Sequence, residues 1–322
     1  MKKYLVTGGA GFIGSNFIHY LFRKYPDCHV INLDKLTYAG NLDNLLDVAN
    51  NPQYKFVHGD IADIDVVKKL LPEVDYIVHF AAESHNDRAI LDPSIFLQTN
   101  VLGTQRLLEA AKDVSIKRFH HISTCEVFGE LELDEKRKFK ESDPYQPKTP
   151  YNASKAGANH VVMSYYYTFQ IPVTISHCCN NYGPYQFPEK LIPLFATNAL
   201  DDQPLPLFKS STHKREWIHV DDHSEAIDLI LEKGKIGEAY NVGTGVEKSV
   251  EEITNLILDN LGKHHSLKKY VPDRLQHDKR YLLDSSKIIR ELGWTPHYDF
   301  EKGIQETVQW YKNNKSWWRK LK

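Results

Sequence analysis

Three glycines directly after the first predicted strand constrain the fold of this chain more than any other feature. Gly8, Gly11 and Gly14 stand three residues apart, between the strand predicted for Tyr4–Thr7 and a helical pattern. Glycine lets such a turn close tightly and lets backbone N–H groups approach a pyrophosphate at the N-terminus of the helix. The strand, the turn and the helix together predict a dinucleotide-binding βαβ unit.

The first 180 residues alternate short apolar runs with helical patterns. Apolar runs of this kind are typical of parallel strands that are covered on both faces. We therefore predict an α/β fold: a Rossmann-type doubly wound parallel sheet with a smaller C-terminal α/β substrate domain. The predicted strands are Tyr4–Thr7, His29–Asp34, Lys55–His58, Tyr76–Ala81, Arg118–Ser123 and Val173–His177.

After residue 180 prolines interrupt the pattern, and helical patterns return only in separate stretches. These stretches lie near 190–200, 222–232, 250–262, 285–292 and 301–314. We expect residues 1–179 to form the dinucleotide-binding Rossmann domain, completed by segments near 216–243, and residues 180–322 to form most of the substrate domain. The basic, Trp-rich stretch Lys315–Lys322 is interpreted as a solvated helix end.

The choice of dinucleotide depends on Asp34, which ends the second predicted strand twenty residues after Gly14. A carboxylate there accepts hydrogen bonds from a ribose 2′-OH and repels a 2′-phosphate, so we predict NAD rather than NADP. Lys35 follows directly and weakens this preference without reversing it. Asp60, at the end of the third strand, is expected either to meet the adenine edge or to cap a helix.

Composition excludes several other classes of protein. The formal net charge of −2 gives no basic surface for nucleic acid, and no apolar run approaches the ~18 residues of a membrane span. The four cysteines show neither disulfide nor zinc spacing, so no metal site is predicted. A reduced, cytoplasmic protein is the simplest expectation.

Tyr151 and Lys155 are the first candidate catalytic pair. They are four residues apart in a helical pattern and therefore lie on one helix face. An ammonium group beside a phenol favours the phenolate and is expected to lower the pKa of the tyrosine. The phenolate can then remove a proton from a sugar hydroxyl while hydride leaves the same carbon for nicotinamide.

Further polar side chains follow the fifth predicted strand, at the edge of the sheet where ligands bind. Ser123 and Thr124 are expected to orient a substrate alcohol, or else to cap the next turn. Glu126 is a candidate general base for a C–H acidified by a neighbouring ketone, or else an exposed acid in a loop. Between them stands Cys125, either a reactive thiol or a small buried residue at a strand end.

With these motifs the chain resembles the extended short-chain dehydrogenase/reductases, and among them the nucleotide-sugar 4,6-dehydratases, over nearly its full length. The segments that carry the resemblance are 34–41 (DKLTYAGN), 81–88 (AAESHNDR), 180–193 (NNYGPYQFPEKLIP), 215–222 (REWIHVDD) and 274–281 (RLQHDKRY).

The resemblance implies a reaction without net redox change. Tyr151 and Lys155 would support oxidation of C4 of the hexose, water would be lost across C5–C6, and hydride would return to C6. In the family an Asp-Glu pair carries out the dehydration, with the Asp protonating the departing C6 hydroxyl. This chain has Cys125 in place of that Asp and keeps Glu126.

The resemblance also assigns binding residues. The cofactor would be NAD, held by Gly8, Gly11, Phe12, Ile13, Gly14, Asp34, Lys35, Thr37, Asp60, Ile61, Ala81, Ala82, Asn100, Tyr151 and Lys155. The nucleoside-diphosphate sugar would be held by Ser84, His85, Asn180, Lys190, Leu191, Phe208, Arg215, Asn241, Arg274 and His277. Guanidinium groups suit this second task because they bind phosphates through two parallel hydrogen bonds.

The product and the sugar stay open at this stage. The expected activity is that of an NDP-hexose 4,6-dehydratase acting on a dTDP- or UDP-hexose. Alternatives are a UDP-N-acetylglucosamine enzyme that gives a 5,6-ene, C5-inverted or 4-keto product, and a catalytically silent NAD-binding regulatory protein. A homodimer is implied, through the helices Ser94–Ala111 and Tyr151–Phe169, where Tyr165 and Tyr166 belong to the dimer contact or to the core.

Overall fold

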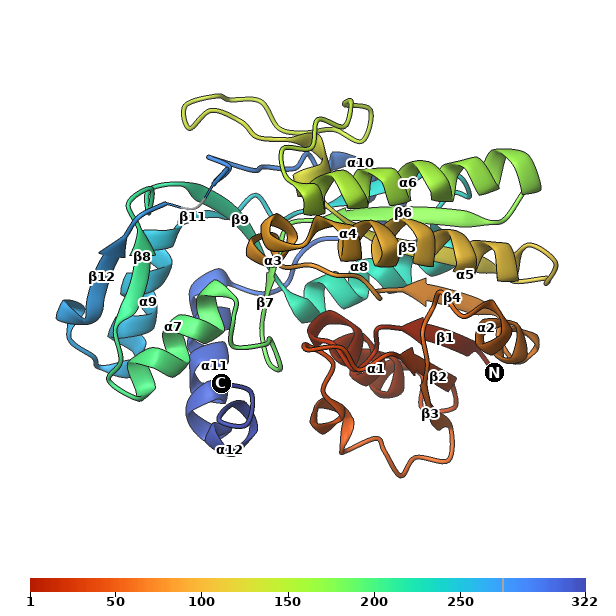
Figure 1. The fold of residues 1–322 in the computed structure, drawn as a ribbon, viewed down its shortest axis with the longest axis horizontal. Coiled ribbons are helices and arrows are strands. Elements are labelled where there is room, and N and C mark those ends of the chain that lie inside the picture. The colour runs from red at the N-terminus through yellow and green to blue at the C-terminus, as the bar shows by residue number, and fades with distance from the viewer. Residues whose placement is uncertain (274) are drawn as a thin grey trace.

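The computed structural model describes residues 1–273 and 275–322, and Figure 1 shows them as two lobes side by side. The larger lobe contains a seven-stranded sheet with the order β10-β6-β5-β4-β1-β2-β3, in which every pair is parallel. Its strands are β1 (Lys3–Thr7), β2 (His29–Asp34), β3 (Tyr54–His58), β4 (Tyr76–His79), β5 (Arg118–Thr124), β6 (Val173–Cys178) and β10 (Ala239–Val242). The six strands predicted from the sequence are confirmed, with ends that differ by at most two residues.

Helices cover both faces of this sheet, because successive residues of a strand point to opposite sides. Leu5 and Phe119 pack into one apolar cluster with residues of α2, α5 and α6. Tyr4 and Ile122 pack into a second cluster with residues of α1 and α8. These helices are α1 (Phe12–Lys24), α2 (Ile64–Leu70), α5 (Thr104–Ala111), α6 (Pro150–Phe169) and α8 (Val220–Lys233). The expected doubly wound Rossmann-type fold is therefore confirmed.

Three segments from the second half of the chain belong to this lobe, namely α8 on its face, β10 at its edge and α10 (Ser286–Leu292), which packs against β10. The rest of that half forms the smaller lobe, which appears in green and blue in Figure 1. The division of the chain into residues 1–179 and 180–322 itself stays a prediction.

The smaller lobe holds two short sheets, ordered β11-β9-β7 and β12-β8, against three helices. Its strands are β7 (Asn180–Tyr182), β8 (Leu205–Phe208), β9 (Lys214–His219), β11 (Glu247–Ser249) and β12 (Lys268–Val271). Its helices are α7 (Leu191–Leu200), α9 (Val250–Leu261) and α11 (Phe300–Asn313), while α10 (Ser286–Leu292) packs near β10. The helical patterns predicted after residue 180 are confirmed.

The helix predicted for Ser94–Ala111 contains a change of geometry. It consists of α4 (Pro93–Phe96), a π-helical segment η3 (Leu97–Gly103) and α5. Segments of this kind occur mostly as local insertions in α-helices, and often at functional sites. Here η3 brings Asn100 into hydrogen-bond contact with the loop after β4.

The C-terminal stretch is not the solvated helix end that the sequence suggested. Trp318 in α12 (Lys315–Trp318) is fully buried, and Trp317 is 8% exposed. The Trp317 indole donates to Asn44 Oδ1 at 2.9 Å in the larger lobe, and Tyr185 packs edge-on against the Trp317 ring. The two indoles explain the error, since their burial outweighs the solvation of the surrounding lysines. No helix in the described ranges is long and apolar enough to span a membrane.

Candidate active site

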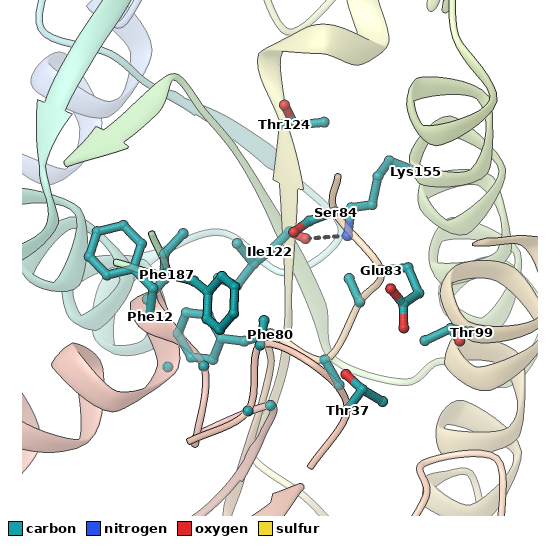
Figure 2. Close-up of a pocket in the computed structure, with 18 of the residues that line it drawn as sticks. Phe12, Thr37, Phe80, Glu83, Ser84, Thr99, Ile122, Thr124, Lys155 and Phe187 are labelled. Carbon is teal, nitrogen blue, oxygen red and sulfur yellow. Dashed lines mark hydrogen bonds between the residues drawn. The ribbon is translucent and has the colours of Figure 1, made fainter. Parts of the chain in front are cut away.

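A cavity of about 350 Å³ lies at the carboxyl ends of the parallel strands. Its wall is formed by the glycine turn after β1, by the segments after β2 to β5, and by the loop after β7. It unites predicted cofactor residues (Gly8, Gly11, Phe12, Ile13, Gly14, Asp34, Lys35, Thr37, Asp60, Ile61, Ala81 and Ala82), catalytic residues (Thr124, Cys125, Glu126, Tyr151 and Lys155) and substrate residues (Ser84, Asn180 and Lys190). Figure 2 shows part of this wall, with the hydrogen bond from Lys155 to Ile122 drawn as a dashed line.

The glycine turn has little room for any side chain. A Cβ on Gly14 would lie 2.4 Å from the Gly8 carbonyl oxygen, and one on Gly8, where φ is +71°, would lie 2.6 Å from the backbone nitrogen of Ala81. The first turn of α1 can therefore approach β1 closely, and its free N–H groups open onto the cavity. This arrangement fits the pyrophosphate of a dinucleotide.

The far end of the cavity fits a ribose without a 2′-phosphate. Asp34 is 8% exposed, and its carboxylate is oriented by the backbone N–H groups of Ala10 and Leu36, at 2.9 and 2.8 Å. Lys35 forms an ion pair with Asp60 at 2.7 Å, which neutralises the cation that could otherwise receive a 2′-phosphate. The residues present therefore fit NAD. Asp60 lines the cavity but does not cap α2, because Asp63 accepts hydrogen bonds from the first backbone N–H groups of that helix.

Tyr151 and Lys155 lie on the first turns of α6, whose start is fixed by Thr149 as N-cap and by Pro150. Lys155 Nζ donates to the Ile122 carbonyl at 2.7 Å and lies 3.5 Å from His121 Nε2. Burial lowers the pKa of Lys155 to about 8.

Burial acts on Tyr151 in the opposite direction and raises its pKa well above the ordinary value. The negative charge of Glu126 acts in the same sense, and a hydrogen bond with Thr124 opposes both. The expectation that Lys155 lowers the pKa of Tyr151 is therefore wrong for the chain by itself. The buried ammonium is turned to the Ile122 carbonyl, and desolvation of the phenol outweighs any attraction.

Thr124, Cys125 and Glu126 begin the short helix η4 (Cys125–Phe128) at the end of β5. The Thr124 hydroxyl accepts a hydrogen bond from the backbone N–H of Glu126 at 3.2 Å. It therefore caps this turn, which is one of the two roles expected for it. Glu126 is half-buried and accepts a hydrogen bond from Asn86 Nδ2 at 3.1 Å, which excludes the exposed loop acid. Ser123 is buried beneath them.

Cys125 is 1% exposed and belongs to an apolar cluster with Cys178 and Cys179. Burial raises the pKa of its thiol well above the ordinary value, and the charge of Glu126 adds to this. The thiol is therefore protonated at neutral pH and lies in the cavity wall beside a carboxylate. Cys125 is thus a small buried residue at a strand end, and its thiol also faces the cavity. Both of the interpretations offered from the sequence therefore apply to it.

Some predicted residues do not line the cavity. Asn100 is 2% exposed and hydrogen-bonds the main chain of Glu83 at both its N–H and its carbonyl, so it acts on the cavity wall from behind. His85 stands at the N-cap position of α3 (Asn86–Leu91), and its Nε2 lies 3.8 Å from Glu189 Oε2. Leu191 begins α7 directly after Lys190.

The remaining predicted substrate residues form a second group in the smaller lobe. Phe208 and His277 pack edge to face with 5.1 Å between ring centres, and Ser210 lies 2.7 Å from the His277 ring nitrogen. Arg215 is 7% exposed, and its guanidinium lies 4.8 Å from the centre of the Tyr281 ring. Asn241 lies elsewhere, on β10, where its amide donates to the carbonyl of Phe139. The predicted phosphate ligand Arg274 lies outside the described residues.

Sequence reasoning missed a set of contacts that joins the two lobes over the cavity. Tyr38, in the loop after β2, donates its hydroxyl to Glu189 at 2.8 Å, and Lys190 donates to the Ser84 carbonyl at 3.0 Å. Within the larger lobe, the Arg88 guanidinium lies 3.7 Å from the centre of the Tyr38 ring and so supports the first of these contacts. We call these three contacts the clasp. All five residues stand within the quoted segments 34–41, 81–88 and 180–193, but pairing between loops leaves no periodic signal in a sequence.

Known proteins match this chain over nearly their full length. A dTDP-glucose 4,6-dehydratase of Mycobacterium tuberculosis is 46% identical over 321 residues, which is 99% of this chain and 96% of the relative. DesIV, a dTDP-glucose 4,6-dehydratase of Streptomyces venezuelae solved with NAD and TYD bound, is 50% identical with a TM-score of 0.96, covering 99% of this chain and 100% of DesIV.

A third relative is the dTDP-glucose 4,6-dehydratase of Bacillus anthracis, solved in complex with NAD. It is 45% identical with a TM-score of 0.93, and the match covers 100% of both chains. The family described as GDP-mannose 4,6 dehydratase matches residues 5–307. The chain therefore belongs to this family of nucleotide-sugar dehydratases, within the extended short-chain dehydrogenase/reductases.

Proposed function

We propose that this protein is an NAD-dependent NDP-hexose 4,6-dehydratase, a lyase, and that dTDP-glucose is the first substrate to test. The observation that carries the proposal is a single cavity that unites a dinucleotide turn and Asp34 with Tyr151, Lys155, Cys125 and Glu126. A site for redox chemistry alone has no use for the last two groups. The three relatives, each a dTDP-glucose 4,6-dehydratase, support the same function.

The first step is oxidation at C4 of the hexose. NAD, when bound, supplies a hydride acceptor and brings a positive charge into the cavity, which opposes the effect of burial on the pKa of Tyr151. Tyr151 then takes the proton of the C4 hydroxyl, and Thr124 orients that hydroxyl. Lys155, held at the Ile122 carbonyl, stabilises the phenolate from the same helix.

The second step is loss of water across C5–C6. The C4 ketone acidifies the C5 proton, which Glu126 removes, while Cys125 gives its proton to the departing C6 hydroxyl. Glu126 then returns its proton to C5, and bound NAD, once reduced, would supply the hydride at C6 that completes a 4-keto-6-deoxy sugar. The sum is a hexose losing one water, without net oxidation.

Counting protons shows one further requirement. After this sequence Tyr151 has gained a proton, Cys125 has lost one, and Glu126 is unchanged. The enzyme returns to its starting state only when a proton passes from Tyr151 to Cys125. Thr124 hydrogen-bonds Tyr151 and directly precedes Cys125, so we assign its hydroxyl to this proton route.

The group in the smaller lobe is proposed to hold the nucleoside diphosphate. Phe208 offers an aromatic face for the base, and His277 packs against it. Arg215 is a buried cation which, in the described part of the chain, has carbonyl groups and an aromatic ring around it but no carboxylate within ion-pair distance. A diphosphate would supply the missing negative charge. Arg274 and Asn241 are retained in this proposal on the resemblance alone.

A second outcome at the same site is favoured by Cys125. A buried thiol is a weaker acid than a carboxyl group, so departure of the C6 hydroxyl is the step most open to change. A UDP-N-acetylglucosamine enzyme that forms a 5,6-ene or inverts C5 is the alternative that this substitution supports.

Incubation with dTDP-glucose and with UDP-N-acetylglucosamine in D₂O, followed by mass spectrometry and NMR, tests the proposal. A product that has lost one water and carries deuterium at C5 supports 4,6-dehydration. Deuterium at C5 without loss of water would sink it in favour of epimerisation, and a 5,6-ene would identify the alternative. If neither sugar reacts, although the chain binds NAD, a silent regulatory protein becomes the better description.

We also propose a homodimer formed through the helical segment 93–111 and α6. Exposed apolar side chains lie on both elements: Leu97 is 54% exposed, Leu102 48% and Tyr167 70%. Tyr165 belongs to the core instead, since it is 7% exposed and bonds Glu109 within the chain. A cytoplasmic location is proposed as well, since all four cysteines are free thiols.

A further inference from the structure

One carboxylate in the cavity wall, that of Glu83, has no role in the steps above. Glu83 follows β4 in the loop that also carries Ser84, and the residue is only 7% exposed. Among the described residues its carboxylate has neither a hydrogen-bond donor nor a cation within ion-pair distance. Figure 2 shows this carboxylate directed into the cavity, in the view between Lys155 and Thr99.

The main chain around this carboxylate is rigidly held. Asn100 Oδ1 accepts a hydrogen bond from the Glu83 backbone N–H at 2.8 Å, and Asn100 Nδ2 donates to the Glu83 carbonyl at 2.9 Å. The same Nδ2 atom lies 2.8 Å from the Ser154 hydroxyl of α6. The loop is thus fixed through its backbone by η3 and α6. The side chain of Glu83 contributes nothing to this and is presented as a preorganised acceptor.

Charge limits what this acceptor can bind. Burial raises the pKa of Glu83, nearby Arg88 and Lys35 oppose the rise, and the negative charge of Glu189 adds to it. A second anion, such as a phosphate, would meet repulsion there. The carboxylate oxygens open onto the cavity, where O–H or N–H donors of a ligand can take the place of solvent around them.

We propose that Glu83 accepts hydrogen bonds from two neighbouring hydroxyls of a sugar ring in the cavity. Two carboxylate oxygens match such a pair, as Asp34 is expected to do at the other end of the site. Both the ribose of NAD and the hexose carry neighbouring hydroxyls, so the shared chemistry is a vicinal diol. This inference rests on the proposed function, because that function brings both sugars into the cavity.

Glu83→Gln is the central test, since it keeps the size of the side chain and removes the charge. Dissociation constants are measured by calorimetry, for NAD with protein stripped of cofactor and for dTDP-glucose with NAD saturating. We expect one of them to rise about 10- to 100-fold, the loss typical of a hydrogen bond to a charged group. A rise for NAD identifies the ribose, and a rise for the sugar alone identifies the hexose. If neither constant changes, the proposal is overturned.

Two further variants guard the interpretation. Glu83→Asp keeps the charge and should retain more affinity than Glu83→Gln, whereas equal losses would point to a packing effect and overturn the proposal. Glu73→Gln, at an exposed carboxylate on the far side of the Rossmann lobe, should leave both constants unchanged. The NAD measurement does not depend on turnover. Failure of the wild-type protein to form a 4-keto sugar would therefore refute the proposed function without deciding the role of Glu83.

Discussion

The thiol of Cys125 needs no environment that raises its pKa in order to be protonated at neutral pH, whereas a carboxyl group at this position would need one. A carboxyl group stays protonated at pH 7 only if its pKa is raised by about three units, which corresponds to roughly 4 kcal/mol. A thiol is protonated at that pH already, and burial strengthens this in Cys125. The cost appears in the reaction instead, because a weaker acid assists the departing hydroxide less.

Substitution of Cys125 therefore separates its two interpretations. If the thiol is the acid, Cys125→Ala should lower the rate of water loss by about 10²- to 10⁴-fold, the usual contribution of general acid catalysis, and Cys125→Asp should restore it. The readout is formation of the 4-keto-6-deoxy sugar in single turnover. Cys28→Ala, at a buried thiol away from the cavity, serves as the control. A Cys125→Ala enzyme as fast as wild type would reduce Cys125 to a packing residue.

Lys155 gives a prediction about pH. Only its ammonium form stabilises the Tyr151 phenolate, and its pKa is lowered from 10.5 to about 8 by burial. The rate of C4 oxidation should therefore fall as the pH rises through about 8, although deprotonation of Tyr151 alone would favour a rise. A rate that stays constant to about pH 9.5 would show that Lys155 keeps its proton by other means.

The effect of Lys155 on stability has the opposite sign. Its pKa in the folded state lies below 10.5, so between about pH 8 and 10.5 the unfolded chain binds more protons. The contribution of this group to the free energy of unfolding therefore rises with pH across that window. Urea denaturation of wild type and of Lys155→Met at several pH values measures this contribution. Its pH dependence should vanish if the pKa of the amine is the same in the folded and unfolded states.

At the scale of elements, the glycine turn and the start of α1 act as one unit. Gly14→Ala would place a Cβ 2.4 Å from the Gly8 carbonyl oxygen and 2.8 Å from the Gly9 Cα, so the turn must open. We expect NAD binding to weaken by at least tenfold in calorimetric titration. Gly262→Ala is the matched control: its Cβ would meet nothing within 4 Å, but φ is +62° there. It should lower stability by about 1 kcal/mol and leave NAD binding unchanged.

Among the secondary-structure elements, the strands were predicted best from the sequence and the π-helical segment η3 was not predicted at all. Strands were found within two residues because burial of both sheet faces leaves an apolar run in the chain, as in His29–Asp34. The π-helical segment η3 left no such trace, since its geometry depends on bonds between Asn100 and a loop distant in sequence. The unpaired carboxylate of Glu83 escaped for the same reason: the segment 81–88 showed where it stands, but only the fold shows what is missing around it.

For the molecule as a whole, the dimer is the first property to measure. Leu97→Glu combined with Leu102→Glu places two charges on an apolar face of the segment 93–111 and should produce a monomer in analytical ultracentrifugation. Ile236→Glu, at a side chain that is 48% exposed outside the two proposed helices, should leave the dimer intact. A double variant that sediments like wild type would show that this face is not the contact.

The relation between the two lobes was the part least accessible to sequence reasoning. Doubly wound topology follows from alternation of strands and helices, and the cofactor end of the cavity follows from one local motif. The proposed substrate end draws on β8, β9 and residues 275–281, which come together only when the chain has folded, as in the packing of Phe208 against His277 and the bridge between Lys214 and Arg280. The burial of Trp317 against the opposite lobe is likewise a long-range event that a local reading of lysines and tryptophans misjudges.

The clasp has a practical consequence for anyone who purifies this protein. Tyr38 with Glu189, and Lys190 with Ser84, join loops of both lobes across the cofactor end of the cavity, so exchange of a dinucleotide with solvent requires these contacts to break. The proposed reaction regenerates NAD in every turnover, so the enzyme does not need to exchange its nucleotide with solvent. The isolated enzyme should then carry its nucleotide through chromatography, convert sugar in buffer to which none was added, and show an absorbance ratio at 260 and 280 nm above that of the bare polypeptide.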